Sequence, residues 1–341
     1  MKAVKKILIN IALLFAALCF VIMLAEVFVR IFYPESHDHV LPAGLYVNDS
    51  YLGWKLAKEK SVNYHFTLFD VNYTTNSFGF RDKERLIEKK KGVYRILLYG
   101  DSQTFGWGNP VEKRFSNLLE KALQNIEIWN LSVPAYGLDQ EILSYKRNAF
   151  KADAVMFFIS DYTLSRVNYD YLYQKSKPEF VINNSNELEF IPPQKPGAFK
   201  EFINDSIRWM FLPFFLENKI SALSGKPIVE GSVLNSIIKD KNDRLNNLEK
   251  RLILFARDLT ISRNNLMIVL FNSLSLKGKE VKDSCVQNKI TCYDINVNVK
   301  GNGLILGRTD GHWNSKANNI IFNNLLPQMR HLVAENLSSK S

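Results

Sequence analysis

Residues 93–106 read VYRILLYGDSQTFG, and this stretch decides the fold. Val93 to Tyr99 is a short, largely apolar run that ends at a glycine. A run of this length bounded by glycine is typical of a strand buried in a parallel sheet. Arg114 to Gln124 then carries apolar residues at helical spacing. The pattern predicts a strand, a tight turn and a helix.

The same alternation recurs along the chain and favours an α/β domain with a parallel sheet. Further strands are predicted at 126–130, 154–160, 266–271 and 291–295, and further helices at 139–150, 237–260 and 316–336. Residues 62–75 alternate as extended structure does.

Residues 163–236 interrupt the rhythm and are interpreted as an insertion. Within it, 180–182 and 187–191 flank a polar turn and predict a hairpin, and the aromatic-rich stretch 202–216 predicts a helix. The predicted domains are an anchor at 1–30, a connector with extended segments at 31–92, and the α/β domain at 93–336.

The N-terminal segment is apolar enough to cross a membrane. Ile7 to Ala25 contains one polar residue and no charge, and its length matches a hydrocarbon core of about 30 Å. Lys2, Lys5 and Lys6 precede it, so the N-terminus is expected in the cytoplasm and the remainder in the periplasm or outside the cell. An uncleaved single-pass anchor is favoured, and a cleaved signal peptide stays open.

Composition excludes some classes of protein. The 341 residues are 46% hydrophobic with a net charge of +10, which suits a globular protein. The only tight basic run is Lys89 to Lys91, so no nucleic-acid partner is expected. Cys285 and Cys292 are close in sequence, and the spacing is compatible with a disulfide loop or with two separate thiols.

Ser102 follows the first buried strand where a helix begins, which suits a nucleophile. Its backbone N–H would face the cleft in which open α/β sheets bind ligands, and the helix N-terminus would stabilise a developing oxyanion. The hydroxyl needs a base. Of five histidines, His312 stands after the last strand, two residues beyond Asp310. One loop could therefore deliver an imidazole to the serine and a carboxylate to the far ring nitrogen.

Residues 93–106 and 310–318 (DGHWNSKAN) resemble the first and last blocks of the SGNH, or GDSL-type, hydrolases. The resemblance implies a flavodoxin-like three-layer α/β/α domain with a parallel sheet, here preceded by a transmembrane helix. It also implies that Ser102 is the nucleophile, His312 the general base and Asp310 the residue that orients the base.

The family's oxyanion hole uses the backbone N–H of the serine, the backbone N–H of a glycine and the side-chain amide of an asparagine. The resemblance places Ser102, Ala135 and Ser160 at these positions. Ala135 keeps a backbone N–H, unless the position needs a positive φ, and the Ser160 hydroxyl is shorter than an amide arm. Because one oxyanion donor is worth about 10²–10³ in rate, both departures bear on catalytic power.

We expect a serine esterase or acylhydrolase acting on an ester, O-acetyl among the candidates, of an envelope glycan or lipid. No metal or organic cofactor is implied. Two alternatives stay open: an O-acetyltransferase of extracytoplasmic polysaccharide, and a non-catalytic, membrane-tethered glycan-binding or assembly protein. The expected partners are the acylated substrate and the membrane, and the sequence does not define an oligomeric state.

Overall fold

The computed structural model describes residues 2–33, 42, 44–66, 68–172, 175–194, 210–213, 215–216, 219, 244–299, 303–307 and 310–338. The chain divides into two compact units, one made of 1–40 and 196–238 and the other of 41–195 and 239–341. The first unit contains helix α1 (Lys2–Phe32), and the second contains the sheet.

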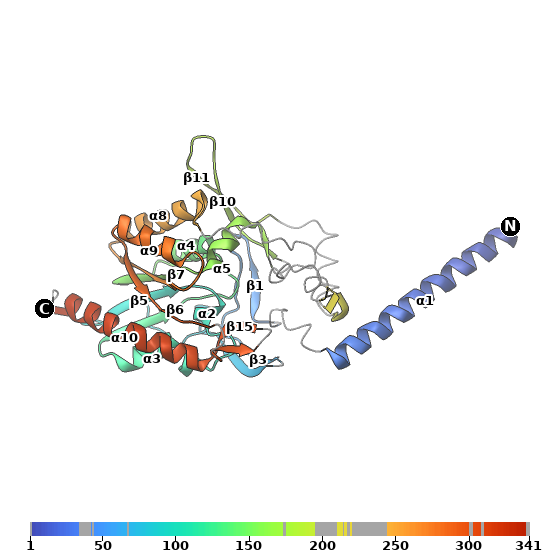
Figure 1. Cartoon of the computed structure of the whole chain (residues 1–341), viewed down its shortest axis with the longest axis horizontal. Coiled ribbons are helices and arrows are strands. Elements are labelled where there is room, and N and C mark those ends of the chain that lie inside the picture. The colour runs from blue at the N-terminus through green and yellow to red at the C-terminus, as the bar shows by residue number, and fades with distance from the viewer. Residues whose placement is uncertain are drawn as a thin grey trace. The chain divides into compact units, whose positions relative to one another are not determined.

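Five parallel strands form the central sheet of the second unit, in the order β13–β12–β7–β5–β6 (Figure 1). Numbered by chain order, this is the 2-1-3-4-5 arrangement of flavodoxin-like sheets. The predicted α/β class with a parallel sheet is confirmed. The strands are β5 (Tyr94–Tyr99), β6 (Ile126–Asn130), β7 (Ala154–Phe158), β12 (Leu266–Phe271) and β13 (Thr291–Asp294).

Helices cover both faces of this sheet (Figure 1). On β5, Leu97 and Tyr99 join one apolar core, whereas Ile96 and Leu98 join the other. All six residues of β5 are buried, because a strand covered on both faces has no solvent side. The first core includes α4 (Leu138–Arg147), α8 (Asn247–Ser262) and α9 (Gly278–Gln287), and the second includes α3 (Phe115–Ala122) and α10 (Ser315–Ser338).

Short antiparallel pairs and helical turns surround the sheet. The predicted hairpin in the insertion is present, and residues 62–66 and 69–74 belong to another. The pairs are β1 (Tyr46–Asp49) with β2 (Gly53–Leu56), β3 (Ser61–Phe66) with β4 (Phe69–Thr74), β8 (Tyr171–Leu172) with β9 (Lys175–Ser176), β10 (Glu179–Ile182) with β11 (Leu188–Ile191), and β14 (Ile305–Gly307) with β15 (Asp310–Trp313). The short helices are α2 (Ser102–Phe105), α5 (Asp161–Ser165) and the 3₁₀ turns Val111–Lys113 and Arg166–Asn168.

Two helices differ from the prediction. Residues 244–246 are not helical, and α8 begins at Asn247 instead of Ile237. Asn246 and Glu249 exchange side-chain and backbone hydrogen bonds in a capping box that sets this start. Helix α9 was not predicted, because its buried apolar side chains are only Val281 and Cys285. Residues 237–243, and most of the helix predicted at 202–216, lie outside the described residues.

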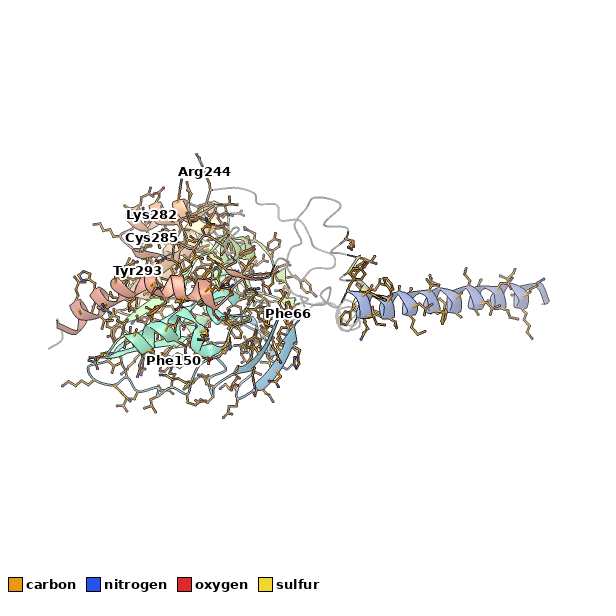
Figure 2. The ribbon with its side chains drawn as sticks, turned by 60° about the horizontal axis from the view of Figure 1, so that its bottom comes forward. Phe66, Phe150, Arg244, Lys282, Cys285 and Tyr293 are labelled. Atoms are coloured by element: carbon orange, nitrogen blue, oxygen red, sulfur yellow. A yellow bond between two sulfur atoms is a disulfide. The ribbon has the colours of Figure 1, made fainter. Side chains whose placement is uncertain are left out.

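Cys285 of α9 and Cys292 of β13 form a disulfide, with Cα atoms 6.3 Å apart (Figure 2). Cys285 is also buried in the first apolar core. Of the two options that the spacing left open, the structure shows the disulfide.

Helix α1 has the character of a membrane-spanning segment. Its apolar part, Val4–Phe32, comprises 29 residues, and none of its most apolar window is buried. It is long and apolar enough to cross a bilayer. A signal sequence has the same character.

Candidate active site

The nucleophile candidate Ser102 lies at the turn between β5 and α2. Asp101 caps α2, since its carboxylate accepts a hydrogen bond from the backbone N–H of Gln103 at 2.9 Å. Gly100 is required because a Cβ atom there would collide with the side chain of Thr104. Ser102 is 6% exposed. As the first residue of α2, it has a backbone N–H with no acceptor inside the helix.

Ser102, His312 and Asp310 form a hydrogen-bonded series. Ser102 Oγ lies 2.7 Å from His312 Nε2, and His312 Nδ1 lies 2.6 Å from Asp310 Oδ1. With Asp310 ionised and the imidazole neutral, Nδ1 carries the ring hydrogen and Nε2 accepts the hydroxyl hydrogen of Ser102. The structure thus brings together the three residues singled out in the sequence, in the order that activates a serine.

His312 lies in strand β15 and not in the predicted loop, because residues 310–313 pair with β14. This strand is held by residues that follow the nucleophile. Gln103 accepts the backbone N–H of Trp313 at 2.9 Å and donates to the carbonyl of Gly311 at 3.3 Å. Asn109 donates to the carbonyl of Trp313 at 2.6 Å. Since these contacts hold the backbone on both sides of His312, the imidazole is oriented before any substrate binds.

An aromatic cluster backs the imidazole. The ring of Trp107 lies 5.7 Å from that of His312. Trp107 also packs against rings of the β3–β4 hairpin, so the extended segment of the predicted connector forms a wall behind the candidate base. The rings of the hairpin in contact with Trp107 are Tyr64, Phe69 and Tyr73.

Ala135 lies in the loop after β6. The backbone N–H of Val133 donates to the carbonyl of Gly100 at 3.0 Å, which ties this loop to the nucleophile turn. The φ of Ala135 is +70°, so the position does need the left-handed region that favours glycine. An alanine costs about 1–2 kcal/mol there. Among the residues that the structure describes, none accepts its backbone N–H.

Ser160 caps α5. Its Oγ accepts the backbone N–H of Thr163 at 3.1 Å, and its own N–H donates to Thr163 Oγ1 at 2.8 Å. The cap uses a lone pair of the hydroxyl and leaves its hydrogen available to a substrate oxygen. Strand β7, which precedes Ser160, pairs with β5 in parallel. Ser160 and Ser102 therefore both follow the carboxyl ends of strands, on the same side of the domain.

Arg166 joins two parts of this site and was not predicted. Its guanidinium lies 3.0 Å from Asp101 Oδ2 and donates to the carbonyl of Tyr136 at 3.2 Å. Arg166 is 5% exposed and Asp101 1%. Breaking such a buried pair typically costs about 3–5 kcal/mol. No local signal in the sequence marks this arginine, because its partners lie 65 and 30 residues away.

Glu141 of α4 is a second group that sequence reasoning missed. It is 0% exposed, and neither carboxyl oxygen has a hydrogen-bond partner among the described residues. Burial raises the pKa of this carboxyl well above its ordinary value, the carboxylate of Asp101 raises it further, and Arg166 opposes the shift. The folded state therefore favours the neutral acid.

Two other histidines lie elsewhere, in exposed pairs with carboxylates. His65 is 3.2 Å from Asp70, and His331 is 3.2 Å from Glu335. His37 and His39 fall outside the described residues. In the part of the chain that the structure describes, no group of three or more His, Cys, Asp or Glu side chains could hold a metal ion.

No protein-family model and no curated protein matches the chain. Similar solved structures include a member of the lipolytic protein G-D-S-L family from Veillonella parvula DSM 2008, at 11% identity and a TM-score of 0.39, covering 69% of this chain and 97% of that one. The psychrotrophic esterase EstA from Pseudoalteromonas sp. matches at 10% identity and a TM-score of 0.39, with 70% and 98% covered. LAE5, an alpha/beta hydrolase enzyme from the Lake Arreo metagenome, matches at 10% and 0.39, with 69% and 94% covered.

The strained φ of Ala135 predicts that replacing this residue with glycine changes the free energy of unfolding very little. In Ala135→Gly, relief of about 1 kcal/mol from the left-handed conformation offsets about 0.8 kcal/mol for the lost buried methyl. The free energy of unfolding should therefore stay within about 1 kcal/mol of wild type. The matched control Ala256→Gly removes a buried methyl from α8 and should lose about 2 kcal/mol, because helix propensity adds to the loss. Equal losses in a denaturant titration would contradict the strain.

Glu141 predicts a pH-dependent stability. Its raised pKa means that the unfolded chain releases this proton at a lower pH than the folded chain. Stability contributed by the protonated form is complete below the ordinary glutamate pKa and is lost as pH rises toward the folded value. Glu141→Gln should therefore raise the melting temperature over wild type, by a margin that grows from pH 4.5 to 8. The exposed control Glu187→Gln should show no such growth, and a flat margin for Glu141→Gln would refute the prediction.

Proposed function

We propose that this chain is a membrane-anchored serine esterase or acylhydrolase that cleaves an ester, an O-acetyl group among the candidates, on an envelope glycan or lipid. The observation that carries the proposal is the hydrogen-bonded series from Ser102 through His312 to Asp310. It lies at the carboxyl edge of a parallel sheet, where ligands bind in open α/β folds.

The proposed reaction proceeds through an acyl-enzyme. Ser102 Oγ attacks the ester carbonyl carbon while His312 Nε2 takes the hydroxyl proton, and Asp310 stabilises the resulting imidazolium. His312 then gives this proton to the alcohol oxygen as the ester C–O bond breaks. A water molecule, deprotonated by His312, attacks the acyl carbonyl, and the carboxylic acid leaves as Ser102 regains its proton.

Three donors are proposed for the oxyanion. The backbone N–H groups of Ser102 and Ala135 come from the ends of the neighbouring strands β5 and β6, and the hydroxyl of Ser160 comes from the end of β7 on the other side of β5. Donors held by a rigid scaffold need no reorganisation as the charge develops.

The proposed location follows from α1 and from the disulfide. Lys5 and Lys6 precede the uncharged apolar stretch of α1 from Ile7 to Ala25, which favours a cytoplasmic N-terminus. The Cys285–Cys292 disulfide supports an oxidising compartment for the second unit, since such bonds rarely persist in the cytoplasm. An envelope substrate is the class that an enzyme in this place would meet.

A fluorophosphonate probe tests the proposal, because it reacts with an activated serine. Full-length wild type in membranes should be labelled, and Ser102→Ala should not. His312→Ala should label at least about 10³-fold more slowly, since the serine loses its base. The control His331→Ala removes the histidine of an exposed His–carboxylate pair and should label at the wild-type rate.

If the folded wild-type protein is not labelled by the probe, the enzyme hypothesis is refuted and the non-catalytic binding protein remains. With labelling established, an O-acetylated glycan separates the two reactions. Release of free acetate supports hydrolysis, whereas transfer of the acetyl group to an added sugar supports the acetyltransferase.

Substitutions of Ser160 test the third donor. Ser160→Gly removes the hydroxyl yet costs only a few tenths of a kcal/mol as a helix cap, so kcat should fall by about 10²-fold with little change in melting temperature. Ser160→Asn keeps an effective cap and supplies an amide donor, so its kcat should equal or exceed that of wild type. A Ser160→Gly enzyme with wild-type kcat would remove Ser160 from the oxyanion hole.

A further inference from the structure

The first compact unit contains a docked pair of segments: the end of α1, and the described residues between 210 and 219. The carboxylate of Glu26 accepts the backbone N–H groups of Phe211 and Leu212, each at 2.8 Å. Arg30 donates to the same carboxylate at 2.7 Å. The Glu26 side chain is only 13% exposed, and these three donors satisfy it.

Aromatic and cationic side chains extend this contact. The guanidinium of Arg30 lies 4.8 Å from the centre of the Phe211 ring. The rings of Tyr33 and Phe215 are 4.8 Å apart, and the ammonium of Lys219 lies 5.5 Å from the Tyr33 ring. Aromatic rings beside arginine and lysine are typical of the boundary between a membrane and water.

The position of Glu26 along α1 indicates the depth of the contact. The apolar part of α1 has 29 residues, about 43 Å at the helical rise, whereas the hydrocarbon core is about 30 Å thick. If Lys5 and Lys6 mark the cytoplasmic face, about 20 residues cross the core and Glu26 stands at its outer boundary. An ion pair is tolerated there, whereas it is costly at the centre of the bilayer.

Apolar side chains of both segments remain uncovered at this level. In the docked segment, Leu216 is 48% exposed and Met210 37%. In water such a surface costs about 25 cal/mol per Å², whereas the outer headgroup layer would cover both segments. The exposed apolar residues of α1 beyond Glu26 are Val27, Phe28, Ile31 and Phe32.

We propose that the described residues between 210 and 219 act as an interfacial element that contacts the outer headgroup layer of the membrane and is held to α1 by Glu26. The proposal rests on the proposed anchoring of α1. A lipid bilayer is the occupant because the element is attached to the one described helix long and apolar enough to span a membrane. Its aromatic, apolar and cationic side chains suit that boundary.

Depth-dependent quenching tests the proposal on the full-length protein in vesicles of phosphatidylcholine and phosphatidylglycerol. Cys19 is free, so an environment-sensitive fluorophore can be attached to it as a reference within α1. In a Cys19→Ser background, the same fluorophore is placed at Leu216→Cys or, as a control on the second unit, at Leu274→Cys, whose leucine is 57% exposed.

Lipids with a spin label deep in the acyl chain should quench the label on Cys19. Lipids with a shallow spin label should quench the label at Leu216→Cys, and only aqueous iodide should quench the label at Leu274→Cys. Iodide quenching at Leu216→Cys equal to that at Leu274→Cys, with Cys19 still quenched by lipid, would overturn the interfacial element and leave the anchor intact. A Cys19 label untouched by lipid would overturn both.

Glu26→Ala tests the attachment. Loss of its charge-assisted hydrogen bonds should weaken docking of the segment about tenfold, so shallow quenching at Leu216→Cys should fall while quenching at Cys19 stays unchanged. Wild-type quenching at Leu216→Cys in this variant would refute the role of Glu26. If lipid does not quench the label at Leu216→Cys but an added peptide changes its fluorescence, the surface binds a protein and not the bilayer. That result would also overturn the proposal.

Discussion

The hydrogen bond between Ser102 Oγ and His312 Nε2 joins segments 210 residues apart, and the second unit is arranged so that they meet. Strand β5 lies where the strand order reverses. The residues that follow β5 therefore enter the crevice at the carboxyl ends of the strands. Helix α10 begins just after His312, and its buried residues pack in the same core as Ile96 and Leu98 of β5. The burial that stabilises α10 thereby also delivers the candidate base to the nucleophile.

Buried charge places a second constraint on the turn between β5 and α2, which carries Ser102. Asp101 uses one carboxylate oxygen to cap α2 and the other to bind Arg166, and a charge this deeply buried requires such partners. Because Arg166 also binds the carbonyl of Tyr136, the loop that contains Ala135 is fixed by the same network. A strained residue persists where its surroundings over-determine it, which accounts for an alanine at a φ of +70°.

The sequence predicted the sheet better than its surroundings. Strands β6 and β12 have the predicted bounds. Strand β12 is a continuous apolar run, as expected of a strand buried on both faces, whereas β6 includes Glu127 and Asn130. Helix α9 was not predicted because two buried apolar side chains make no periodic pattern. In the site, Ser102 stands in a local motif just after β5, and Asp310 and His312 stand in a local motif within β15. Arg166 and Glu141 do not, since their properties come from groups that only the folded chain brings near.

The serine at position 160 illustrates how one side chain can meet two demands. As the cap of α5, its oxygen must accept the backbone N–H of Thr163. As an oxyanion donor, its hydroxyl must present a hydrogen to the cleft. A hydroxyl can do both at once, because the lone pair and the hydrogen are separate sites on one oxygen. An asparagine divides the same tasks between its carbonyl and its NH₂ group, which lie at the end of a longer arm. The cap is therefore compatible with either residue, and the exchange alters chiefly how far the third donor reaches toward the substrate.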